Sequence, residues 1–126
     1  MPRNRNLIAC DSGVSAVETA IVLAAFLTFI FGIIKFSLVL WTQSGLYYAA
    51  EQAARCASVN STSCGTVSNI TSYALSHYYG QPMSANPFSY SATGCGHTVT
   101  ASYTYPMTLP FAGTYSIPLT AAACFP

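Results

Sequence analysis

The stretch that decides the fold is AIVLAAFLTFIFGII, residues 20–34. It contains no charged side chain, and with its edges, from Val17 to Trp41, it is long enough to cross a hydrocarbon core of about 30 Å as a helix. A helix satisfies its own backbone N–H and C=O groups, which lipid cannot do. The sequence therefore predicts one membrane-spanning helix.

Charge is scarce and unevenly placed. Charged residues make up 6% of the chain, against a usual share of about 25%, and none of them follows Arg55. A nearly neutral protein has no long-range field with which to gather nucleic acid, so we expect no nucleic-acid partner. Without an acidic group to orient a base or nucleophile after Arg55, we expect no catalytic residues and no enzyme activity.

A short polar segment, residues 1–13, precedes the apolar run and carries Arg3 and Arg5. Because basic residues stay on the cytoplasmic side of a span, we expect a cytoplasmic N-terminus and an exported C-terminal part. The segment ends in Gly13, and Glu18 follows five positions later, at the mouth of the apolar run. A carboxylate at that position costs free energy in lipid, which suggests that Glu18 has a task.

Beyond the apolar run the helical pattern continues, so we expect one helix from Val14 to Cys56. Its later part has a row of small residues at every fourth position, which would let another helix or sheet approach closely. The members of this small-residue row are Gly45, Ala49, Ala53 and Ala57. Residues 66–79 have the spacing of a short amphipathic helix, with Gly80 as its stop.

The rest of the chain predicts a small antiparallel sheet. The expected strands are residues 87–92, 98–105 and 115–124. The second alternates with period two, and we expect Pro106 and Pro110 to end it. Pro118 implies that the third strand lies at an edge or bulge. The fold class expected is α+β, with a long N-terminal transmembrane helix, a short second helix and a small antiparallel sheet.

Five cysteines are present, of which Cys10 lies in the polar leader. The other four, on the exported side, are Cys56, Cys64, Cys95 and Cys124. In an oxidising compartment they predict two disulfides, for which three pairings are possible. We favour Cys56–Cys64, which would fasten the helix end to the next turn, and Cys95–Cys124, which would tie two strands. The other pairings stay open, and each bridge would stabilise the domain by about 2–4 kcal/mol.

Two other uses of the cysteines, metal binding and lipid attachment, agree less well with the sequence than disulfides do. Cys64, His77, Cys95 and His97 do not have the paired spacing of a structural zinc site, so we expect no metal and no other cofactor. Leu7-Ile8-Ala9-Cys10 imitates a lipobox, but attachment of lipid to Cys10 would need a hydrophobic segment before it, and only six residues precede Leu7.

The region from Gly13 to Ala57 resembles the N-terminal region of TadE-like proteins, which are minor pilins or pseudopilins of the tight-adherence (Tad, Flp) type IV pilus system. The stretches that carry the resemblance are GVSAVE (13–18), AVETAIVL (16–23), GIIKF (32–36), AAEQAARCA (49–57) and, more loosely, VTASYTYP (99–106). Thr19 stands where the major Flp pilin has a tyrosine, which disfavours a major-subunit role.

The resemblance implies a pilin-like protein with specific partners. A prepilin peptidase would cut after Gly13, so that the mature chain begins at Val14. Glu18 would neutralise the new N-terminal amine of a neighbouring subunit during assembly. The implied partners are the prepilin peptidase, other pilin or pseudopilin subunits, the pilus assembly machinery and the bacterial inner membrane, which the chain would cross once with its N-terminus in the cytoplasm.

The expected organisation has four parts. They are a leader (1–13), a transmembrane helix (14–41), an exported continuation of the helix (42–57) and a small disulfide-stabilised exported domain (58–126). The function expected is that of a minor pilin or pseudopilin in Tad/Flp pilus assembly or adhesion. The alternative is a membrane-anchored exported binding module that does not polymerise, for which nine tyrosines after residue 46 would supply contact area.

Overall fold

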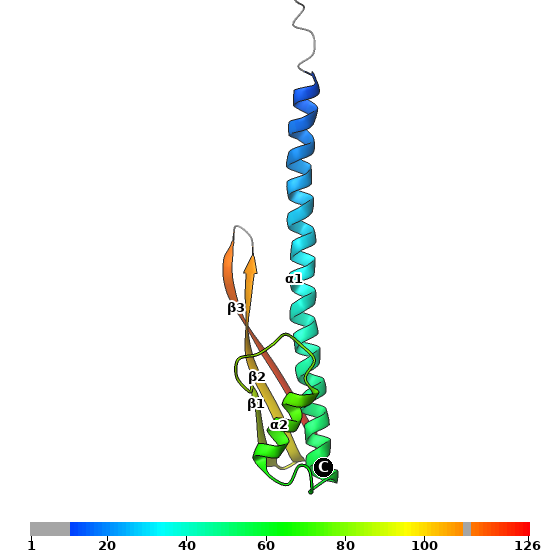
Figure 1. Ribbon diagram of the computed structural model, residues 1–126, viewed down its shortest axis with the longest axis vertical. Coiled ribbons are helices and arrows are strands. Elements are labelled where there is room, and N and C mark those ends of the chain that lie inside the picture. The colour runs from blue at the N-terminus through cyan, green and yellow to red at the C-terminus, as the bar shows by residue number, and fades with distance from the viewer. Residues whose placement is uncertain (1–10, 110–111) are drawn as a thin grey trace, which may run out of the picture. The chain divides into compact units, whose positions relative to one another are not determined.

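The computed structural model describes residues 11–109 and 112–126 (Figure 1). Its elements are α1 (Asp11–Val59), α2 (Val67–His77), β1 (Phe88–Thr93), β2 (Gly96–Leu109) and β3 (Gly113–Phe125). The expected fold class is confirmed: a long apolar N-terminal helix, a short second helix and a small antiparallel sheet. Residues 1–10 of the expected leader, which include Arg3, Arg5 and Cys10, lie outside the described residues.

The chain divides into two compact units, with the boundary between Ile34 and Lys35. In the first unit, the described side chains of residues 13–34 are exposed apart from the half-buried Ile30. Two hydroxyl groups within this apolar segment bond to its own backbone. Thr19 Oγ1 donates to the carbonyl of Ser15 and Thr28 Oγ1 to that of Ala25, each at 2.8 Å. Among the described residues, α1 is the one helix whose length and composition would allow it to cross a membrane.

The second unit contains the C-terminal part of α1, which packs one side into a hydrophobic core. Leu46 is fully buried there. The small-residue row faces the same core, since Gly45, Ala49, Ala53 and Ala57 are all buried. The small-residue row is therefore covered within this unit, by the chain itself.

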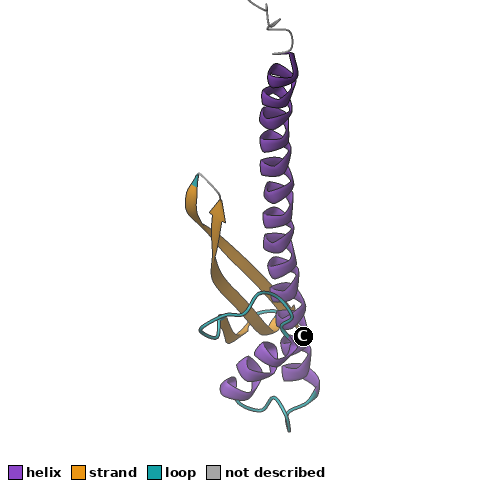
Figure 2. Ribbon diagram, turned by 45° about the horizontal axis from the view of Figure 1, so that its top comes forward, coloured by secondary structure: helices purple, strands orange, loops and turns teal. Residues whose placement is uncertain are grey.

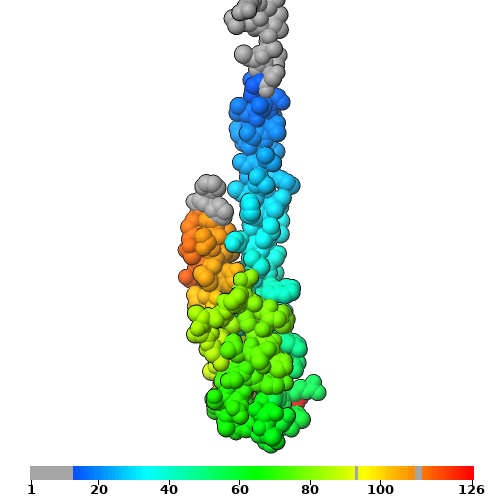
Figure 3. Space-filling view, viewed as in Figure 1, coloured from blue at the N-terminus to red at the C-terminus, as the bar shows by residue number. Residues whose placement is uncertain are grey.

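The second helix is short and well capped. Thr66 is its N-cap, and the side-chain oxygen of Thr66 accepts a hydrogen bond from the backbone N–H of Asn69 at 3.2 Å. Ile70 and Ala74 face the core. The helix ends at His77, two residues before the expected end, because the backbone of Tyr78 is extended. The space-filling view shows α2 and its flanking loops, in green, over the front of this unit (Figure 3).

The three strands form one antiparallel sheet in the order β1-β2-β3 (Figure 2). The register aligns Phe88 with Ala101, and Ala101 with Ala121. In β2 the buried residues are Val99, Ala101 and Tyr105, whereas the residues between them are more exposed. This is the predicted period-two alternation, which gives the sheet one face in the core and one face outward.

The prediction that Pro106 ends the second strand is wrong, because β2 continues to Leu109. The N–H of Ser102 points towards the β1 side, where it donates to the carbonyl of Pro87 at 3.1 Å. Pro106, four positions on, directs its nitrogen to the same side, and the ladder with β1 has already ended at Ala101. No backbone hydrogen bond is therefore lost there.

The boundaries of the first and third strands differ from the expected ones by one or two residues. Pro118 lies in β3, which is an edge strand as expected. Pro110 lies outside the described residues. The first strand begins and ends one residue later than expected, and the third extends the expected range at both ends.

The structure joins the cysteines in the two pairs that the sequence favours. Cys56 is bonded to Cys64, with their Cα atoms 5.9 Å apart, across a sequence separation of 8. Cys95 is bonded to Cys124, with Cα atoms 6.3 Å apart, across a separation of 29. The first pair links the end of α1 to the loop before α2, and the second links the β1–β2 turn to β3. The oxidation state of these four cysteines in the cell stays a prediction.

Candidate processing and assembly site

Gly13 lies in the first turn of α1. No described atom outside its own stretch of helix lies within 4 Å of the position that a Cβ would take at Gly13. The φ angle of Gly13 is not positive, whereas the φ angles of Gly96 and Gly113 are. A glycine in a helix costs about 1 kcal/mol relative to alanine. Neither the packing nor the backbone of the described residues therefore requires a glycine at this position.

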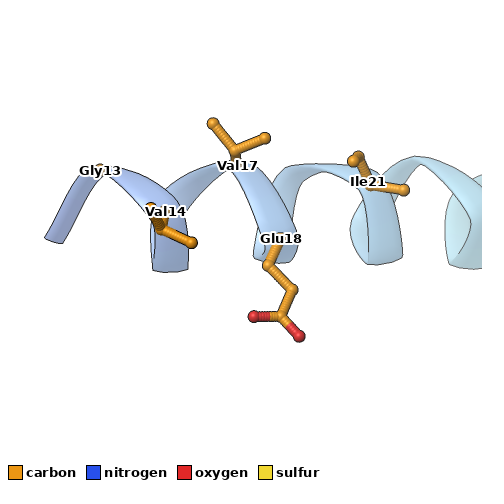
Figure 4. Close-up of a pocket in the computed structure, with 5 residues that line it drawn as sticks. All are labelled: Gly13, Val14, Val17, Glu18 and Ile21. Atoms are coloured by element: carbon orange, nitrogen blue, oxygen red, sulfur yellow. The ribbon is translucent and has the colours of Figure 1, made fainter. Parts of the chain in front are cut away.

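Glu18 lies on α1 among apolar neighbours. Figure 4 shows Val17 and Ile21 on one side of the helix and the carboxylate of Glu18 pointing to the other. The side chain of Glu18 is exposed. Within the part of the chain that the structure describes, it forms no ion pair. A carboxylate without a cation is costly in an apolar environment, so the stabilising charge has to come from elsewhere.

The spacing of Val14 and Glu18 suggests a source for the positive charge that would stabilise the Glu18 carboxylate. The two residues stand at i and i+4 and so lie one turn apart on α1. If the chain began at Val14, its amine and the free N–H groups of the first helical turn would form a positive end close to the carboxylate. The same positive end on another copy would be an equally suitable partner for Glu18.

The structure gives other partners to the residues considered for zinc. Cys64 and Cys95 are each bonded to another cysteine. The Nδ1 atom of His97 is 2.7 Å from the hydroxyl of Tyr90, and that of His77 is 2.9 Å from the carbonyl of Tyr73. The described residues contain no group of three or more His, Cys, Asp or Glu side chains placed to hold a metal ion.

An aromatic cluster joins α1 to the loop after α2. Trp41 Nε1 donates to the carbonyl oxygen of Tyr79 at 3.0 Å, and their rings meet edge to face with centroids 5.8 Å apart. The ring of Tyr48 lies 5.4 Å from that of Tyr79. The sequence pattern gives no sign that Tyr79 contacts Trp41 or Tyr48. Residues 38 positions apart share no local periodicity, so only the fold shows this contact.

A further set of apolar side chains is exposed at the start of the second unit. Phe36, Leu40 and Trp41 have exposed fractions of 61%, 53% and 58%. They leave an uncovered apolar surface on α1 directly after the segment that can span a membrane. Such a surface is typical of a contact with lipid headgroups or with another protein.

Residues 13–55 match the family described as TadE-like protein. That family suggests a Tad pilus-associated protein of a structural, non-enzymatic kind. Over these residues, about a third of the chain, the protein is similar to this family, in agreement with the resemblance found in the sequence. This family implies other pilus components as partners. No curated protein and no solved structure matches the chain.

Proposed function

We propose that the protein is a minor pilin or pseudopilin of the Tad/Flp pilus, processed by a prepilin peptidase after Gly13. The observation that carries the proposal is Glu18, an exposed carboxylate on an apolar helix without a cation among the described residues. A membrane anchor does not need such a residue. A subunit whose new Val14 amine meets a neighbour's Glu18 does need it, because the two opposite charges offset each other within the lipid.

The burial pattern supports a membrane segment of residues 14–34, which is shorter than the expected 14–41. Val39 is only 6% exposed and belongs to the core of the second unit, together with Leu46. Side chains packed within an exported domain have to lie outside the bilayer. Residues 14–34 rise about 31 Å as a helix, which matches the hydrocarbon thickness. Lys35 would then lie at the outer headgroups, where its ammonium group stays hydrated.

In this topology the chain crosses the bacterial inner membrane once, with its N-terminus in the cytoplasm. The leader with Arg3 and Arg5 supports that orientation. The uncovered apolar side chains Phe36, Leu40 and Trp41 lie just outside the bilayer, where neighbouring subunits would cover them. The competing proposal, an anchored binding module that does not polymerise, gives no reason for either Gly13 or Glu18.

Mass spectrometry of the protein recovered from the membrane tests the processing step. We expect a mature chain that begins at Val14, and a Gly13→Leu variant that keeps its leader. Gly32→Leu is the matched control, because Gly32 lies on the same helix and has no described atom outside its own stretch of helix within 4 Å of its Cβ position. This variant should be cut normally. A wild-type chain with any other start, or normal cutting of Gly13→Leu, would contradict the proposal.

A further inference from the structure

A groove of about 360 Å³ is lined by Tyr47 of α1 and by residues of β2 and β3. Ligand pockets usually enclose about 300–1,000 Å³, so its size suits a small molecule. One tyrosine, three Ser or Thr residues and three alanines line it. These residues are Tyr47, Thr100, Ala101, Ser102, Thr120, Ala121 and Ala122.

Two features of the fold form this groove, namely a hydrogen bond between α1 and β3 and the register of β2 with β3. Gln43 Nε2 donates to the carbonyl oxygen of Thr120 at 2.6 Å, which holds α1 against the edge of β3. Tyr47 follows Gln43 by one helical turn and so comes to the same edge. Across the sheet, the register aligns Ser102 with Thr120 and Thr100 with Ala122. The side chains of two strands and one helix thus converge on one space.

Several polar groups of the groove remain available to a ligand. Thr100 Oγ1 is 2.7 Å from Ser89 Oγ and is already paired. The hydroxyl groups of Tyr47, Ser102 and Thr120, by contrast, have no hydrogen-bond partner within the described part of the chain. The ring of Tyr47 is 50% exposed. Each free hydroxyl can both donate and accept a hydrogen bond.

The small side chains leave room for a flat ligand. Ala101 and Ala121 are each 3% exposed and direct their methyl groups into the core, so that their backbone borders the groove, whereas Ala122 presents its small methyl group on the exposed face. None of the lining residues is charged. A charged ligand would therefore lose hydration without gaining a counter-charge, which disfavours phosphates, carboxylates and amines. Glu51, one turn beyond Tyr47 on the exposed side of α1, would in addition repel an acidic ligand.

We propose that this groove binds one ring of a neutral saccharide. A sugar ring combines hydroxyl groups, which pair with those of Ser102, Thr120 and Tyr47, with weakly positive C–H groups on its flat side. Those C–H groups suit the face of an aromatic ring, which carries partial negative charge. The proposal does not depend on processing or polymerisation, because the groove lies entirely within the second unit.

Nuclear magnetic resonance of the full chain in phosphatidylcholine nanodiscs tests the proposal. Nanodiscs are used because detergents with sugar headgroups could themselves bind in the groove. The probes are the methyl glycosides of glucose, galactose, mannose and N-acetylglucosamine, up to about 10 mM, which is high enough to detect a dissociation constant of about 1 mM. We expect at least one to shift the backbone signals of Tyr47, Ser102 and Thr120. N-acetylneuraminic acid and glycerol should bind more weakly.

Variants separate the groove from the rest of the surface. Tyr47→Ala should weaken the binding about tenfold, because it removes the ring contact. Thr120→Val keeps the shape of the side chain and removes one hydroxyl, and it should weaken the binding several-fold. Tyr115→Ala is the matched control, since Tyr115 is 52% exposed but does not line the groove. No shift with any neutral sugar, equal shifts with glycerol, or binding that survives both groove variants would overturn the proposal.

Discussion

The ring of Tyr78 lies directly over Gly45 of α1. A Cβ atom at Gly45 would be 3.1 Å from Cε2 of that ring and 3.1 Å from the backbone nitrogen of Gly80. Both distances are shorter than an ordinary van der Waals contact, and the Gly80 nitrogen belongs to the backbone and cannot rotate away. Gly45 is therefore the position on α1 that lets the loop after α2 reach the helix.

We expect Gly45→Val to destabilise the second unit by about 1–3 kcal/mol, because the added methyl groups would push this loop outward. Urea unfolding followed by the fluorescence of Trp41, the chain's single tryptophan, measures the change. Gly32→Ala is the control and should not destabilise the protein, since alanine is the better helix former and the position is open. Equal stability of Gly45→Val and wild type would show that the loop does not depend on this contact.

The two disulfides should differ in their contribution to stability. In the chain-entropy description, a cross-link stabilises more when it closes a longer loop. We expect replacement of both Cys56 and Cys64 by serine to cost about 2.5 kcal/mol, and replacement of both Cys95 and Cys124 to cost about 3.5 kcal/mol. Urea unfolding of the two double variants gives the order. Alkylation of any of these four cysteines in the exported wild-type protein without reductant would contradict the predicted pairing.

Glu18→Gln tests the charge pairing that assembly is proposed to use. Glutamine keeps the shape of the side chain but cannot attract an amine, so we expect a variant that is inserted and cleaved but is deficient in incorporation or piliation. The measurements are the mass of the mature chain and the amount of surface pilus. Glu51→Gln is the control, because Glu51 is also an exposed acidic residue of α1 but lies in the second unit. Unchanged piliation with Glu18 neutral would eliminate the charge-pair mechanism.

Alkaline pH should weaken the second unit through Tyr78. Its hydroxyl group donates to the carbonyl oxygen of Gln81 at 3.0 Å, and burial raises its pKa above the ordinary value of 10.0. The folded state therefore holds this proton more tightly than the unfolded state. The resulting stability is fully present below the unfolded pKa and declines as pH rises through the folded pKa.

Urea unfolding from about pH 8 to about pH 11 spans the ordinary pKa of tyrosine and measures this decline. Tyr78→Phe has no proton to lose, so its stability should fall less steeply over the same interval. Parallel pH profiles for wild type and Tyr78→Phe would show that Tyr78 is not responsible.

Much of the fold could be predicted from local patterns. The apolar run of residues 20–34 predicts α1, and the alternation over residues 98–105 predicts the centre of β2, because each pattern depends only on neighbours along the chain. The candidate site at Gly13 and Glu18 is likewise a local motif, and the family match over residues 13–55 covers it. The structure adds that packing among the described residues gives no reason for a glycine at position 13.

The sequence by itself determined which segments are helical or extended, since hydrophobic periodicity and the distribution of charge are properties of a short stretch. The tertiary structure decided where distant segments meet. It allows β2 to continue through Pro106 because β1 is too short to need that N–H. It also brings Tyr79 to Trp41, and Thr120 to Gln43 beside the groove at Tyr47. These contacts depend on the packing of one core by segments far apart in the chain, and no local pattern contains that information.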